Sequence, residues 1–165
     1  MVWPTGSEVV LLDRTPQQLE LPLSTRGLAR YYRIGVAGRG FADPTTVSRV
    51  EAFEGIGLRP YPVAHLASVR AATGDLDLAW IRRTRIDGDS WLSPEVPLGE
   101  DSETYAIRVR AGTTILSETT VLAPVWTYGA AQQLSDGATL PFRIEVAQVS
   151  DRFGAGPFRG IDILA

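Results

Sequence analysis

Four residue types are missing or nearly missing from the 165-residue sequence, which has no cysteine, lysine or asparagine and a single histidine, His65. Without cysteine, the chain holds no disulfide framework and no cysteine-ligated zinc. Without lysine, it has no Schiff-base or P-loop lysine. One histidine excludes a two-histidine metal site and an HExxH motif, and a packing or hydrogen-bonding role for His65 is favoured over catalysis. We therefore predict that the chain is not an enzyme and has no cofactor.

The sequence also lacks an excess of positive charge and any long apolar run. Its net charge is −3 and its isoelectric point is about 5.2, so no general attraction to nucleic acid is expected. No apolar run approaches the ~20 residues of a membrane span. With 44% hydrophobic and 21% charged residues, the composition is typical of a globular chain rather than a disordered one.

Apolar residues alternate with polar ones in short runs, and no long segment has a helical period. Clear examples are DLDLAWIRR (75–83), TYAIRVR (104–110) and FRIEVAQV (142–149). A period of two indicates strands with one buried face. Glycine-containing turns such as Thr73–Gly74–Asp75 separate these runs. The one helical turn that we expect lies in GAAQQLSDG, 129–137.

The prolines of GLRPYP (57–62) favour an extended linker, so we predict two domains, 1–58 and 59–165. The first would be a small β-rich domain with strands at 9–13, 19–23, 31–38 and 47–53. The second would hold seven strands, at 62–70, 75–83, 103–110, 115–121, 124–128, 141–149 and 157–163. Seven short strands in about 100 residues are typical of a fibronectin type III-like β-sandwich, and the predicted fold class is all-β.

The stretch WIRRTRIDGDSW, residues 80–91, combines arginines, aspartates and two tryptophans. Trp80 continues the alternating face of Leu76 and Leu78 and should be buried. The following arginines would lie at the strand end or in a loop, where Arg83 or Arg85 should pair with a carboxylate of DGDS or GEDSE. We expect such pairs to be partly exposed and weak. The candidate partner-contact residues are Arg83, Arg85, Asp87, Asp89 and Trp91.

Two motifs suggest chemistry but lack the residues that it requires. DGDS, residues 87–90, spaces carboxylates as a calcium loop does, but it has neither the further oxygen ligands nor the closing glutamate. VAGRGFADP, residues 36–44, does not form the GxGxxG motif of a dinucleotide site. We expect ordinary turns at both places, and no metal site.

Several longer stretches together support a family resemblance. They are GLRPYPVAHLASVR, DLDLAWIRRTRIDGDSW, EVPLGEDSETYAIRV, WTYGAAQQ and VAQVSDRFGAGPF, with EVVLLD, LELPL and YYRIG before them. In order and spacing the chain resembles the C-terminal region of the large tail-tip proteins of siphophage-like tails and alphaproteobacterial gene transfer agents, where the protein is called megatron. The TIM-barrel-like region of those proteins, where hydrolase activity is suspected, has no counterpart here.

The resemblance implies a non-enzymatic structural module of a phage-like tail tip or baseplate, serving assembly and host-surface contact. It implies location at the distal tail of a virion or gene-transfer-agent particle, after synthesis in the bacterial cytoplasm. The implied partners are other tail and baseplate proteins, in a homotrimer, with a bacterial surface polysaccharide or receptor as a further partner. One departure from the fibronectin pattern is that Phe142 or Leu140 replaces the tyrosine expected early in the sixth strand.

A second hypothesis is a carbohydrate-binding accessory module of a cell-wall-degrading enzyme. Such a module needs exposed aromatic rings as a platform for sugars, and the candidates are Trp91, Trp126 and Tyr128. The burial of these side chains separates the two hypotheses.

Overall fold

The computed structural model describes residues 19–88 and 96–164, which divide into two compact units at Glu54 and Gly55. The expected boundary was four residues later, between 58 and 59. The segment between the two positions forms the 3-10 turn η2 (Ile56–Leu58). This turn and the residues after it belong to the second unit. Arg59, for example, donates a hydrogen bond from Nε to the Phe153 carbonyl at 3.2 Å.

The first unit is built around a β-hairpin. Strand β1 (Ala29–Ile34) pairs antiparallel with β2 (Val47–Ala52), and these strands match two of the predicted ones. The predicted strand at 19–23 is wrong: this segment is irregular and leads into the 3-10 turn η1 (Leu23–Thr25). Pro22 precedes that turn and has no N–H to donate to a sheet. The predicted strand at 9–13 lies outside the described residues.

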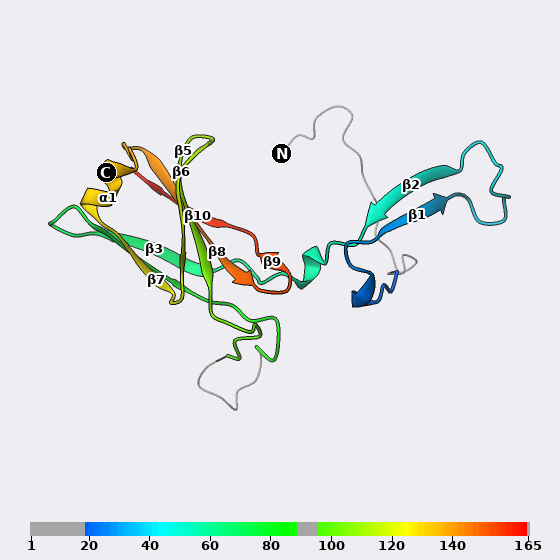
Figure 1. The fold of residues 1–165 in the computed structure, drawn as a ribbon, viewed down its shortest axis with the longest axis horizontal. Helices are drawn as coiled ribbons and strands as arrows, with labels where there is room; N and C mark the ends of the chain where they lie inside the picture. The colour runs from blue at the N-terminus through cyan, green and yellow to red at the C-terminus, as the bar shows by residue number, and fades with distance from the viewer. Residues whose placement is uncertain (1–18, 89–95, 165) are drawn as a thin grey trace, which may run out of the picture. The chain divides into compact units, whose positions relative to one another are not determined.

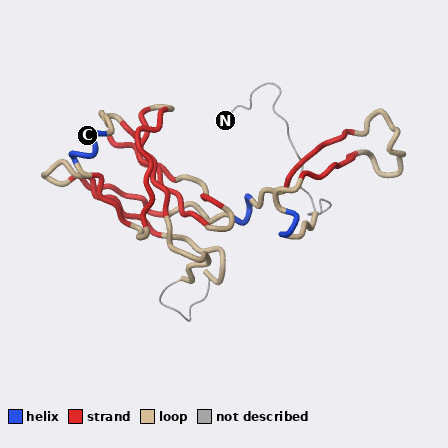
Figure 2. Tube along the Cα trace, viewed as in Figure 1, coloured by secondary structure: helices blue, strands red, loops and turns tan. Residues whose placement is uncertain are grey.

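The second unit is a sandwich of two antiparallel sheets, and all seven predicted strands are present (Figures 1 and 2). One sheet has the order β3-β4-β7 and the other the order β10-β8-β5-β6, with the two-residue strand β9 beside β8. Their bounds are β3 (Ala64–Arg70), β4 (Leu76–Ile81), β5 (Tyr105–Ala111), β6 (Thr114–Val121), β7 (Val125–Tyr128), β8 (Phe142–Ser150), β9 (Gly154–Ala155) and β10 (Arg159–Ile163).

This strand order makes the second unit a fibronectin type III-like sandwich. In an immunoglobulin constant-type domain, the fourth strand belongs to the sheet of the first two. Here the fourth strand, β6, instead pairs with β5 of the opposite sheet. The first, second and fifth strands form one layer, and the other strands form the second layer.

The core lies between the two sheets, on the faces that the alternating pattern predicts. Trp80 is 4% exposed, and its ring meets the Tyr105 ring edge-on at 5.1 Å between centroids. This contact joins β4 of one sheet to β5 of the other. The other large core side chains are Leu76, Leu78 and Tyr128 from one sheet and Ile107, Val109, Phe142, Ile144, Val146 and Ile163 from the other.

A short helix, α1 (Ala130–Ser135), closes one corner of the sandwich where a helical turn was expected. Its first N–H group, on Ala130, donates to the carboxylate of Asp75 at 2.7 Å, so a side chain from the β3–β4 turn caps it. The Tyr128 hydroxyl donates to Asp136 at 2.9 Å. Phe142 begins β8 at the place where a tyrosine was expected, so Tyr128 supplies the hydroxyl bond at this corner instead.

No helix among the described residues is long and apolar enough to cross a membrane.

Replacing Trp80 should show how much the inter-sheet core depends on it. We expect Trp80→Ala to lower the free energy of unfolding by about 3–5 kcal/mol, the usual cost of deleting a buried large aromatic side chain. The matched control Val69→Ala, at a side chain that is 68% exposed, should stay within about 0.5 kcal/mol. Chemical denaturation measures both, and a loss below about 1 kcal/mol for Trp80→Ala would show that the ring is not part of the core.

The Asp75 cap should make stability depend on pH in the acid range. Hydrogen bonds from the Thr73 hydroxyl and the Ala130 N–H hold the pKa of this carboxyl below its ordinary value of 3.8. The unfolded chain then binds the proton more readily, so the stabilisation is present above about pH 4 and is lost as pH falls through the folded pKa. Asp75→Asn should flatten the acid limb of a plot of unfolding free energy against pH, and Thr73→Val should flatten it partly. An unchanged acid limb in Asp75→Asn would contradict the capping role.

Candidate functional site

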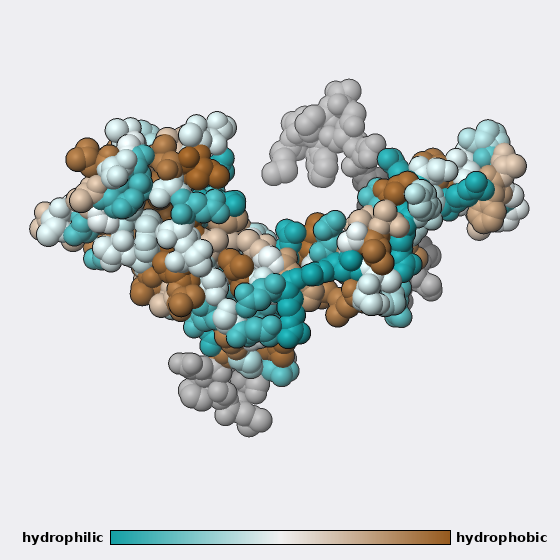
Figure 3. All heavy atoms as spheres, in the orientation of Figure 1, coloured by the Kyte–Doolittle hydropathy of each residue, from teal (hydrophilic) through white to brown (hydrophobic). Residues whose placement is uncertain are grey.

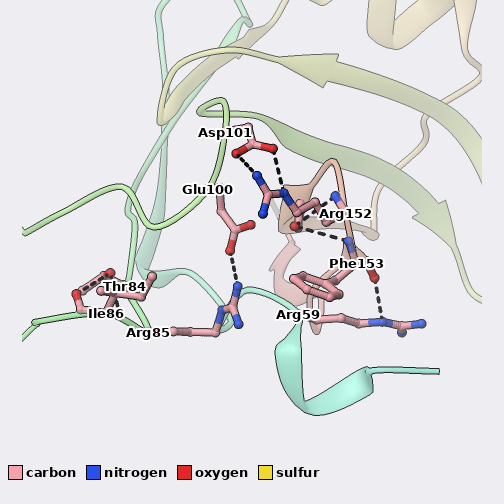
Figure 4. A network of polar contacts seen from close by, with 9 residues as sticks. Arg59, Thr84, Arg85, Ile86, Glu100, Asp101, Arg152 and Phe153 are labelled. Atoms are coloured by element: carbon pink, nitrogen blue, oxygen red, sulfur yellow. Dashed lines mark hydrogen bonds and ion pairs between the residues drawn. The ribbon is translucent and has the colours of Figure 1, made fainter. Parts of the chain in front are cut away.

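The described partner-contact candidates, Arg83, Arg85 and Asp87, lie at one end of the sandwich, in the segment that joins β4 to β5. We call this the loop end: the described parts of residues 82–104, together with residues 150–157 that lead from β8 towards β10. Figure 4 shows charged side chains of both segments gathered around the Phe153 ring. The two segments are far apart in sequence, and the sandwich brings them together because β5 and β8 are adjacent strands.

The central contact of the loop end is an ion pair between Arg85 and Glu100. Their Nη2 and Oε1 atoms are 2.7 Å apart, and the side chains are only 17% and 7% exposed. The Arg85 guanidinium also lies 5.7 Å from the centre of the Phe153 ring. The prediction that Arg83 or Arg85 pairs with GEDSE is therefore confirmed for Arg85. The pair is more buried than the partly exposed and weak pair that we expected, because the Phe153 ring lies against the guanidinium.

Further polar contacts join the two segments of the loop end. Arg152 donates two hydrogen bonds to the carboxylate of Asp101, each of 3.0 Å, and the Ser102 hydroxyl donates to Asp151 at 3.1 Å. Two parallel bonds from one guanidinium fix orientation as well as distance. Sequence reasoning missed the 150–157 segment, although its Asp-Arg pair next to a glycine-rich turn was a signal of charged loop contacts.

Backbone geometry shapes the turn that follows β4. The Thr84 hydroxyl accepts a hydrogen bond from the Ile86 N–H at 3.1 Å. Gly99 has φ +73°, and a Cβ there would lie 3.3 Å from the Thr84 hydroxyl oxygen. A glycine is thus needed both for the left-handed conformation and for the approach of the two halves of the loop.

The remaining predicted residues lie apart from the ion pair or outside the described residues. Arg83 is exposed, and its guanidinium lies over the Tyr61 ring at 5.1 Å from the centroid. Asp87 is exposed in the turn, with a left-handed φ of +47°. Asp89 and Trp91 lie outside the described residues. The structure therefore brings Arg83 and Arg85 to the same end of the sandwich, each on a different aromatic ring.

The side chains in the described part of the loop end join its two segments to each other. Among these residues we find no group of side chains arranged for catalysis. Within residues 19–88 and 96–164, no cluster of three or more metal-ligating side chains is placed to hold a metal ion. His65 is exposed on strand β3, with a left-handed φ of +51°, where β3 carries a bulge between Ala64 and Ala67. Of the two roles expected for His65, packing in the core does not occur, because its side chain is exposed beside the bulge; a hydrogen-bonding role stays a prediction.

Burial also bears on the aromatic platform that sugar binding would need. Tyr128 is fully buried, and Trp126 is half-buried with its ring stacked on Tyr128 at 4.9 Å. Both side chains belong to the core side of β7, so Tyr128 offers no free ring face to a sugar, and one face of the Trp126 ring is covered by Tyr128. The third candidate, Trp91, lies outside the described residues.

The buried Arg85–Glu100 pair should contribute more to stability than an exposed pair. We expect Arg85→Met to destabilise the sandwich by about 1–3 kcal/mol, because it leaves the Glu100 carboxylate buried and unpaired. Adding Glu100→Leu should recover most of the loss. The exposed Arg83→Met is the control and should change the free energy of unfolding by less than about 0.5 kcal/mol. Additive losses in the double variant would show that the pair does not act as a unit.

No family model matches the sequence, and no curated protein matches it at a significant level. Among solved structures, the rat CD45 extracellular region, domains d3-d4, is similar over 99% of this chain and 79% of that chain, with 8% sequence identity and a TM-score of 0.44. The fibronectin type III-like assignment therefore rests on the strand order described above.

Proposed function

We propose that the chain is a non-enzymatic structural module that works by assembling with other proteins, at the tip of a phage-like tail. The tail-tip part of this proposal comes from the sequence resemblance. The assembly part is supported by the surface of the molecule, and above all by the first unit. Its proposed partners are other tail and baseplate proteins, in a homotrimer, with the loop end as the surface that contacts the bacterial envelope.

The observation that carries the assembly role is the hairpin unit, which leaves its apolar side chains uncovered. None of residues 19–54 is buried. Nine large apolar side chains are exposed in this range: Leu19, Leu23, Leu28, Tyr31, Ile34, Val36, Phe41, Val47 and Val50. A two-stranded hairpin is at best marginally stable in water by itself. Contact with another protein would bury these side chains and stabilise the hairpin.

The outer faces of the two sandwich sheets differ in a way that also favours contact with proteins. The outer face of β10-β8-β5-β6 is charged and internally paired: Arg108 with Glu118, Arg110 with Glu145 and Arg143 with Asp162. The outer face of β3-β4-β7 instead exposes Val69 and Val125 at a hollow of about 520 Å³, and Ile81 is also exposed on β4. Figure 3 shows apolar patches on the visible face of the sandwich unit. Exposed apolar patches of this kind mark interaction surfaces.

A substitution on the open hairpin tests the assembly role. Tyr31 is 85% exposed and lies opposite Val50 in the hairpin register. Tyr31→Asp should leave the unfolding of the sandwich unchanged in the isolated chain, because the substitution lies in the other unit. It should lower the yield of tailed particles, counted by electron microscopy, by roughly tenfold or more, since burying an unpaired carboxylate costs several kcal/mol.

The matched control is Leu134→Asp, at an equally exposed apolar side chain on the sandwich helix α1, which is 84% exposed. The control should leave particle yield at the parental level. A parental yield with Tyr31→Asp would contradict the assembly role of the hairpin. An equal loss with both substitutions would show that the effect is not specific to the hairpin.

A further inference from the structure

A groove runs along the open side of the sandwich, between strand β3 and the lead-in to β10. It has a volume of about 770 Å³ and is lined by residues 62–66, Arg83 and residues 157–161. β3 pairs only with β4 and β10 only with β8, so each is an edge strand of its sheet. The described strands show no hydrogen-bonded register between β3 and β10. The groove therefore lies between the outer edges of two sheets, and no further described strand pairs with either edge.

The ionisable side chains that line the groove are all of basic residue types. They are Arg83, Arg159 and the chain's single histidine, His65, and no aspartate or glutamate lines it. All three side chains are exposed. Neither arginine forms an ion pair with any described residue, whereas five other sandwich arginines have carboxylate partners. In a chain of net charge −3, two such arginines in one groove are a local concentration of uncompensated positive charge.

The fold explains why Arg159 lies in the groove. In the β10–β8 register, Arg159 is opposite Val146 and Ile161 is opposite Ile144, so Arg159 belongs to the core-facing side of β10. At the open edge of the sandwich this side of the strand faces the groove instead of the core. Arg83 reaches the groove from the end of β4, where its guanidinium rests on the Tyr61 ring. Two different sheets thus supply the two positive groups.

The two edges differ in their capacity to pair with another strand. β3 is irregular here, because it has an extra residue between Ala64 and Ala67. Bulges of this kind disrupt pairing at a sheet edge. β10 pairs with β8 without interruption from Arg159 to Ile163. A strand that enters the groove would therefore pair with β10.

A guanidinium group already occupies one face of each aromatic ring near the groove, which leaves less ring surface for a sugar. Arg83 lies over Tyr61, and Arg108 lies 4.1 Å from the centroid of Phe158. A sugar would need a free ring face, whereas an extended peptide uses the free backbone groups of an edge strand and places its own side chains beside the arginines. Carboxylates on that peptide would match the uncompensated charge.

We propose that this groove binds an extended acidic peptide segment of a partner protein, which adds as a strand to β10 and places carboxylates against Arg83 and Arg159. The proposal goes beyond the assembly role of the hairpin and holds whether or not the chain belongs to a tail. It names a separate surface on the sandwich unit and the chemistry of its partner.

The test uses the full chain and a fluorescent eight-residue peptide of alternating glutamate and threonine, with binding measured by fluorescence anisotropy. We expect saturable binding that weakens roughly tenfold in Arg83→Gln/Arg159→Gln, since each exposed charge contact contributes a factor of up to about five. Arg70→Gln, on the same strand β3 but outside the groove lining, is the matched control and should bind as the parent does. The thermal melt of the double variant should coincide with that of the parent, because both groove arginines are exposed.

Three further measurements test whether the peptide binds through its carboxylates and by strand pairing with β10. A peptide with glutamine in place of glutamate should bind much more weakly, and a peptide N-methylated at alternate residues should not bind, because it cannot pair with β10. Hydrogen exchange of the β10 amides should slow when the parent peptide is bound. The proposal is overturned if the peptide does not bind at millimolar concentration, if the double variant or the N-methylated peptide binds as tightly as the parent, or if only an anionic oligosaccharide binds the groove.

Discussion

The contact between Trp80 and Tyr105 is the interaction on which the sandwich and its loop end both depend. Trp80 comes from β4 and Tyr105 from β5, and their rings meet edge-on between the two sheets. The long connection that carries the predicted partner-contact residues begins after Ile81, the neighbour of Trp80, and ends at Tyr105. The same pair of rings that joins the sheets therefore fixes the two ends of the loop, so the loop contacts begin from a rigid base.

The charged side chains of the sandwich form three different arrangements. On the outer face of the β10-β8-β5-β6 sheet, arginines and carboxylates neutralise one another. At the loop end, the Arg85–Glu100 pair is largely shielded from water within the β4–β5 connection, and the Arg152–Asp101 pair joins this connection to the segment after β8. In the groove beside β10, Arg83 and Arg159 have no carboxylate partner among the described residues. This last arrangement leaves positive charge for a partner to match.

Alternation of apolar residues was sufficient to predict the seven sandwich strands, because each strand buries one face and the pattern has a period of two. The ion pair of Arg85 was also predictable from the density of opposite charges. Its burial was not, because the shielding ring of Phe153 arrives from a segment whose position only the fold determines. The strand expected at 19–23 failed because the apolar residues there suggest burial, whereas the unit has no buried residue among those described.

The dependence of the hairpin on a partner is the central claim, and hydrogen exchange of its backbone amides tests it most directly. Amides of β1 and β2 should exchange rapidly in the isolated chain, because few apolar contacts oppose opening of the hairpin. The same amides should become protected in assembled particles, while those of β5 and β8 are protected in both states. Hairpin amides protected in the isolated chain as strongly as in the particle would contradict the claim, because the hairpin would then be stable without a partner.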